Sequence, residues 1–134
     1  TAYVKLNRAP WTSKTHGGRW VNVYANAEAA PVYRARGTDY PVGSIIVKES
    51  FEDRGGRPGE PGPIFVMEKR SAGYSPDHGD WWYAIHWAQP GGPRAGAEGP
   101  IYWRGRSPRA NYCWECHDTY DAAMGGIPAG NRAY

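Results

Sequence analysis

Both cysteines of the chain lie in one short motif that a histidine follows directly. The motif is Cys113-x-x-Cys116-His117, the attachment signature of c-type haem. Two thiols at this spacing on a helical turn reach the two vinyl groups of one macrocycle and form thioethers, and the adjacent imidazole takes the proximal position on iron. The motif therefore predicts one covalently attached haem c, with Cys113, Cys116 and His117 as cofactor-binding residues and His117 as the iron ligand.

Two other chemistries use a Cys-x-x-Cys pair. A thioredoxin-like redox pair needs a βαβ context, which this sequence does not suggest. A zinc site needs four ligands, and no second Cys-x-x-Cys or paired histidine cluster completes the set. Haem attachment is therefore the interpretation that we adopt. Because haem c is attached outside the cytoplasm in bacteria, the motif also predicts a periplasmic or otherwise exported protein.

The elements that must position this motif are mostly strands. Five segments are rich in strand-favouring side chains and are bounded by glycine or proline. They are residues 19–24, 44–51, 64–70, 80–87 and 101–104. The sequence thus predicts a mainly β fold, an antiparallel sheet in a single domain over 1–134, with haem c bound near the C-terminus.

One or two short helices are expected beside the sheet. The first covers residues 27–36, with Asn26 as its N-cap and Gly37 as its stop. The second starts near Cys113 and runs to about residue 124. Three loops rich in glycine and proline connect the elements, at 53–63, 88–100 and 125–131, and we interpret the first as a flexible connection without chemistry.

Three further side chains are candidates for a place near the haem. His86 lies in the aromatic segment 80–87, where a histidine is either a ligand or a hydrogen-bonded core residue. Lys48 lies on a strand among Ile and Val residues, where it either faces the haem or reaches solvent. Met67 is a conceivable thioether ligand, although methionine in a strand usually packs. His16 lies in a glycine-containing loop and is expected to be solvated.

Composition excludes several other classes of protein. The 134 residues contain no apolar stretch long enough for a membrane-spanning helix, and two cysteines exclude a disulfide scaffold. A formal net charge of +3, with scattered basic residues, gives no nucleic-acid footprint. The seven tryptophans, ten tyrosines and two phenylalanines supply a large apolar surface for a folded core.

Three blocks, in this order along the chain, resemble the cytochrome P-460 family, which includes the related cytochromes c′-beta. The first is Val23-Tyr24, then a short helix, then Tyr40-Pro41-x-Gly43-Ser44-x-x-Val47-Lys48-Glu49. The second is Phe65-Val66-Met67 followed by Gly79-Asp80-Trp81-x-Tyr83, and the third is the Cys-x-x-Cys-His motif itself.

The resemblance implies a homodimer of mainly antiparallel sheet, with one haem c and an open distal side in each subunit. In the family's catalytic members a lysine of the sheet is cross-linked to the haem, and the enzyme oxidises hydroxylamine. That lysine matches Lys48. The position that matches an early distal arginine is Val21, and no distal acidic group can be matched. Glu49 neighbours Lys48, but strand alternation points it to the other face.

Three functions remain open on this basis. The first is an oxidoreductase of the hydroxylamine-oxidising type, with an electron-transfer partner protein. The second is a non-catalytic protein that binds nitric oxide or carbon monoxide, as the cytochromes c′-beta do. The third is a six-coordinate electron-transfer subunit of a larger complex, with a side chain such as His86 or Met67 as its second axial ligand.

Overall fold

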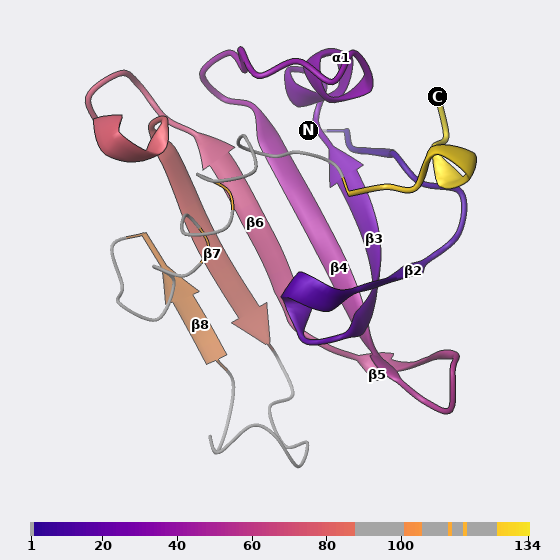
Figure 1. Cartoon of the computed structure of the whole chain (residues 1–134). Coiled ribbons are helices and arrows are strands. Elements are labelled where there is room, and N and C mark those ends of the chain that lie inside the picture. The colour runs from indigo at the N-terminus through magenta and orange to yellow at the C-terminus, as the bar shows by residue number, and fades with distance from the viewer. Residues whose placement is uncertain (1, 88–100, 106–112, 114–116, 118–125) are drawn as a thin grey trace.

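The fold is a single antiparallel sheet with short helical segments packed on it (Figure 1). We analysed a computed structural model of the chain, which describes residues 2–87, 101–105, 113, 117 and 126–134. The strands are ordered β1-β3-β4-β6-β7-β8, and β2 also pairs with β3 and β5 with β4. Their bounds are β1 (Val4–Lys5), β2 (Trp11–Ser13), β3 (Arg19–Ala25), β4 (Ile45–Asp53), β5 (Pro58–Pro61), β6 (Ile64–Lys69), β7 (Trp81–Trp87) and β8 (Ile101–Arg104).

The mainly β fold class predicted from the sequence is confirmed. The five predicted strands are β3, β4, β6, β7 and β8, within two residues at each end. The interpretation of 53–63 as a flexible connection is wrong, because β5 lies in it and pairs with β4 through Phe51↔Pro61 and Asp53↔Pro58. Proline lacks an N–H and is confined to edge positions of a sheet. A short proline-bounded edge strand therefore carries no alternation that a sequence pattern could reveal.

The first predicted helix is α1 (Ala29–Arg34), shorter than expected at both ends. Pro31 falls in its first turn, where its missing N–H is not needed. The left-handed residue after the helix is Arg36, with φ 57°, and Gly37 follows it. The described residues also form three single 3-10 turns: η1 (Lys14–His16), η2 (Pro76–His78) and η4 (Ala129–Asn131). Of the second predicted helix, Cys113 and His117 are helical, and its other residues lie outside those described.

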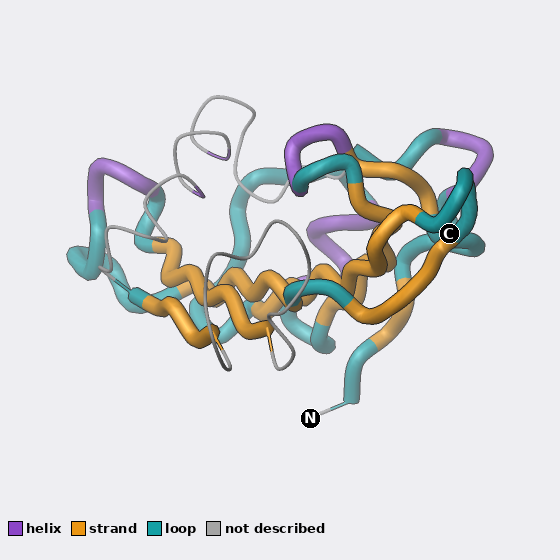
Figure 2. Tube along the Cα trace, turned by 90° about the horizontal axis from the view of Figure 1, so that it is seen from below, coloured by secondary structure: helices purple, strands orange, loops and turns teal. Residues whose placement is uncertain are grey.

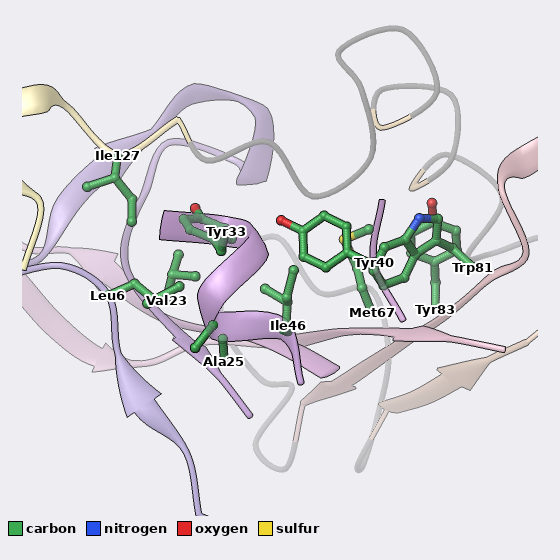
Figure 3. Packing of buried hydrophobic residues seen from close by; sticks show 12 residues of the cluster. Leu6, Val23, Ala25, Tyr33, Tyr40, Ile46, Met67, Trp81, Tyr83 and Ile127 are labelled. Carbon is green, nitrogen blue, oxygen red and sulfur yellow. The ribbon is translucent and has the colours of Figure 1, made fainter. Parts of the chain in front are cut away.

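Strand register places the buried side chains on one face of the sheet. Val23 pairs with Lys48, and Lys48 with Phe65. Residues directly opposite in antiparallel strands point to the same face, so these three form a row across β3, β4 and β6. A neighbouring row holds Ile46 and Met67. Figure 2 shows the helical segments above the layer of strands, and Figure 3 shows the buried side chains gathered between strands and α1.

Asn26 connects the start of α1 to the start of β4. Its side-chain oxygen accepts hydrogen bonds from the backbone N–H of Ala29 at 3.1 Å and of Ile45 at 2.9 Å. Its amide group donates to the carbonyl oxygen of Gly43 at 2.8 Å. The side chain is 2% exposed, so water cannot replace these partners. Asn26 therefore fixes the helix over the end of the sheet that it covers.

We expect Asn26→Ala to lower the free energy of unfolding by about 2 to 4 kcal/mol, because it leaves one buried and one partly buried N–H group without an acceptor. Asn26→Asp keeps both acceptors, but it places a buried carboxylate oxygen against the Gly43 carbonyl oxygen, so we expect it to lose stability as well. Asn131 makes a similar two-way bond to the backbone of Ala9, but at the surface. Asn131→Ala is therefore the matched control, with a loss below about 1 kcal/mol. Denaturant unfolding measures all three, and equal losses at the two asparagines would contradict this role.

Candidate haem site

A cavity of about 370 Å³ lies on the buried face of the sheet. Its floor is the row formed by Val23, Lys48 and Phe65, continued by Met67. Tyr33 of α1 lines it from the side, and the β2–η1 segment 11–16 closes another edge. Cys113 and His117 line it as well. The cavity thus brings the described part of the C-terminal motif together with the centre of the sheet.

Cys113 and His117 suit the attachment of a haem. They lie one helical turn apart, so both side chains point to one side of the chain. Burial, and then the charge of Lys48, lowers the pKa of His117 to about 4. A neutral imidazole is the form that ligates iron. The Tyr83 ring lies 6.0 Å from the imidazole, centroid to centroid. Cys116, the third predicted residue of the motif, lies outside the described residues.

The chemistry of the lining fits the macrocycle too. Phe65, Met67 and Tyr83 present apolar and aromatic surface to the same cavity that Cys113 and His117 line. A thiol for a thioether, a neutral imidazole for iron and an apolar floor for the ring are the parts that a haem c site needs. When bound there, the group would be held by Cys113 and His117, and its iron would supply coordination and redox chemistry beside the other residues that line the cavity.

Lys48 lies in the middle of the cavity floor. It occupies a central strand between Val23 and Phe65, so its amine cannot leave the face on which they lie. Burial lowers the pKa of Lys48 to about 8. None of the ion pairs between described residues includes it. The structure therefore brings this predicted residue into the same cavity as His117, with a larger neutral fraction at neutral pH than an exposed lysine has.

His16 is the cavity residue that sequence reasoning missed. The expectation that it is solvated is wrong: it lines the cavity, its ring lies edge-on to Phe65 at 4.7 Å between centroids, and its Nε2 is 3.5 Å from Lys48 Nζ. It lies in η1, the turn of the β2–β3 hairpin, and Figure 1 shows this turn in front of the sheet. The pairing of β2 with β3 could have revealed its position, but β2 has only three residues.

Gly17 and Arg19, which follow His16 in the chain, hold this hairpin turn over the cavity. Gly17 has φ 76°, and a Cβ there would collide with the guanidinium of Arg19. Arg19 donates from Nη1 to the carbonyl oxygen of His16 at 3.2 Å and from Nε to Glu52 at 2.8 Å. The same guanidinium lies 5.3 Å from the centroid of a Trp87 ring. Arg19 thus ties the turn to β4 and β7.

The structure does not bring His86 to the cavity. Phe65 pairs with Ile85, so Ile85 shares the cavity face and the next residue, His86, points to the other one. There it is exposed and lies edge-on to Tyr102 at 5.7 Å between centroids. Glu49 also lies on that other face, as alternation predicts, and accepts hydrogen bonds from Asn22 and Tyr24, both at 3.1 Å.

Comparison with known proteins adds one finding. The family model described as Cytochrome P460 matches residues 3–123. No curated protein matches the sequence. Within the part of the chain that the structure describes, no helix is long and apolar enough to cross a membrane.

The site also predicts a pH effect on stability. Burial, followed by the charges of Lys48, His117 and Arg19, lowers the pKa of His16 to about 3 from 6.5. Between these values the unfolded chain binds a proton that the folded chain does not, so stability falls as the pH falls through this window. His16→Gln removes the effect. We expect the wild type to lose on the order of 3 kcal/mol more than His16→Gln between pH 7 and pH 4.

Denaturant unfolding of the haem-loaded proteins at several pH values measures this difference. The matched control is His78→Gln, since His78 also ends a 3-10 turn before a left-handed glycine but does not line the cavity. Parallel pH profiles of the wild type and His16→Gln would contradict the burial of a neutral imidazole.

Proposed function

The chain belongs to the cytochrome P460 family, and on that premise we propose that it is an exported monohaem cytochrome that oxidises hydroxylamine at an open haem position. Family membership makes it a c-type cytochrome with haem c as its cofactor. The proposal adds covalent attachment through Cys113 and Cys116, iron ligation by His117, and a further bond from Lys48 to the macrocycle.

One observation carries the proposal: the Lys48 amine and the His117 imidazole line the same cavity. A lysine on a central strand normally costs stability unless its amine reaches water or a partner charge. Here it faces apolar side chains, and its charge is close enough to lower the pKa of His117. Such a placement makes sense for an amine that bonds to the group filling the cavity.

The lowered pKa of Lys48 supports that bond. An amine attacks carbon only in its neutral form, and a pKa of about 8 leaves roughly a tenth of the amine neutral at pH 7. The bond replaces one amine N–H and one macrocycle C–H by a C–N bond. The reaction therefore releases two protons and two electrons. We propose that an oxidant of the peroxide class accepts the two electrons and is reduced to water.

The hairpin of β2 and η1 offers polar groups for a small substrate. Thr12, Ser13 and His16 line the cavity opposite the apolar floor. Hydroxyl and imidazole groups both donate and accept hydrogen bonds, as the N–H and O–H groups of hydroxylamine do. When bound, the haem would supply a coordination position for the nitrogen atom and the redox chemistry of the reaction. Residues of this hairpin would orient the substrate and hold its protons.

A second candidate function, gas binding, has one observation in its favour. None of the described residues that line the cavity is Asp or Glu. Among the described lining residues, the groups beside the cavity floor that could take a proton from a substrate are therefore His16 and Lys48. An apolar cavity suits an uncharged diatomic ligand such as nitric oxide or carbon monoxide. In that function the haem would bind the gas and leave hydroxylamine unoxidised.

Location and partners follow from the same proposal. Attachment of haem c outside the cytoplasm makes the protein periplasmic or otherwise exported. Electrons taken from hydroxylamine need a protein acceptor, and a second copy of the chain would complete the homodimer that is typical of the family.

Optical spectra and turnover of the haem-loaded protein test the proposed reaction. We expect a red-shifted ferrous absorption in the wild type that Lys48→Ala loses, because the bond from Lys48 alters the macrocycle. Turnover with hydroxylamine and an artificial electron acceptor should fall more than about tenfold in Lys48→Ala. The matched control is Lys5→Ala, which removes an exposed lysine of β1 and should change neither measurement.

Two other outcomes would overturn the assignment in different ways. Ready binding of carbon monoxide without hydroxylamine turnover would favour the gas-binding function. A low-spin, six-coordinate spectrum that resists added ligands would favour the electron carrier, and Met67 would then be the ligand to replace, since it lines the cavity and His86 does not. An identical spectrum in wild type and Lys48→Ala would refute the bond to Lys48.

A further inference from the structure

His16 and Lys48 approach each other from distant parts of the sequence. Nε2 of His16 lies 3.5 Å from Nζ of Lys48, a long hydrogen bond between side chains 32 residues apart. At this length the contact stabilises little but still sets a direction. Both residues line the cavity that Cys113 and His117 also line. The pair therefore lies where the proposed function needs the lysine amine to be held.

The contacts of the second ring nitrogen of His16, Nδ1, indicate which of the two ring nitrogens carries the proton. Nδ1 is 2.8 Å from Ser13 Oγ and 3.2 Å from Thr15 Oγ1. A protonated lysine amine has only donors, so Nε2 must accept. The ring proton then lies on Nδ1 and is donated to a hydroxyl of the same turn. Ser13, His16 and Lys48 thus form one chain of hydrogen bonds that ends at the cavity floor.

The imidazole is held in place independently of this chain. Its ring lies edge-on to Phe65, which is also the cross-strand partner of Lys48. Its backbone carbonyl accepts from Arg19. Burial, and then the charges of Lys48, His117 and Arg19, lower its pKa and keep it neutral. The neutral imidazole is thus held beside Lys48 and Phe65, where it can accept a hydrogen bond from the amine without adding a second positive charge.

We propose that His16 is a positioning residue for Lys48: it accepts a hydrogen bond from the lysine amine and so sets the direction of that amine within the cavity. This inference rests on the proposed function for the bond between Lys48 and haem, and it adds the group that selects one orientation of the lysine. Ser13 supports it by accepting a hydrogen bond from the Nδ1–H group.

The first test measures bond yield in the haem-loaded proteins. Proteolysis and mass spectrometry give the fraction of haem peptide joined to the Lys48 peptide. We expect His16→Leu to lower this fraction about two- to threefold, the effect of removing one weak hydrogen bond at the low end of the usual range. His16→Gln should recover most of it, because its side-chain oxygen accepts from a similar place. His78→Gln, the matched histidine outside the cavity, should leave it unchanged. A full yield in His16→Leu would overturn the proposal.

The second test does not depend on the bond to haem. Nitrogen NMR of the diamagnetic ferrous carbon monoxide complex reports the ring proton of His16 and the Lys48 amine. We expect the proton on Nδ1, and a shift of the amine signal in His16→Gln. A proton on Nε2, or an amine signal indifferent to the substitution, would overturn the proposal. If the wild type has no bond to haem while these signals behave as expected, the cross-link fails and the positioning role stands.

Ser13→Ala covers the case in which His16→Leu does not fold. It keeps the imidazole and removes its nearest Nδ1 acceptor, so we expect the bond yield to fall by a smaller factor and the Nδ1 proton signal to shift. An unchanged yield together with an unchanged proton signal would overturn the hydrogen-bond chain.

Discussion

The pairing of Val23 with Lys48 and of Lys48 with Phe65 is the constraint on which the rest of the site depends. The register of an antiparallel strand determines which face its side chains occupy, because a slip of one residue turns every side chain of that strand to the other face. In this register an amine lies between two apolar side chains on the buried face. A slip would bring Glu49 there instead and send Lys48 to the outer face, and the cavity floor would lose its amine.

A chain of this size must use that same buried face for two purposes. The core cluster and the cavity share Val23, Met67 and Tyr83, so the residues that stabilise the sheet also line the site. Small domains bury a smaller share of their surface than large ones do. A haem in the cavity would add apolar contacts to these shared residues. Binding of the cofactor and stability of the fold are therefore linked through the same side chains.

Sequence patterns predicted the parts of this structure that long alternating strands determine. The strand that holds Lys48 and the outward direction of Glu49 both follow from period-two alternation and are present in the structure. His86 was predicted near the haem because it lies in an aromatic strand, yet the same alternation sends it outward once Phe65 is known to face the cavity. Which face of the sheet forms the cavity depends on where α1 and the C-terminal residues pack. No local sequence pattern shows this packing. His16 depends on a three-residue strand and a left-handed glycine, whose partners are far away in the sequence.

Alternation also separates the acidic and basic groups around the site. Glu49 lies on the outer face, held by Asn22 and Tyr24, and Glu52 is paired with Arg19. Neither of these two carboxylates neutralises Lys48, and burial lowers the pKa of its amine. Had Glu49 shared the face of Lys48, an ion pair would have stabilised the ammonium form and raised that pKa. Strand alternation keeps Glu49 away from Lys48, and Arg19 pairs with Glu52. The lysine amine therefore keeps a lowered pKa and is left to donate its hydrogen bond to His16.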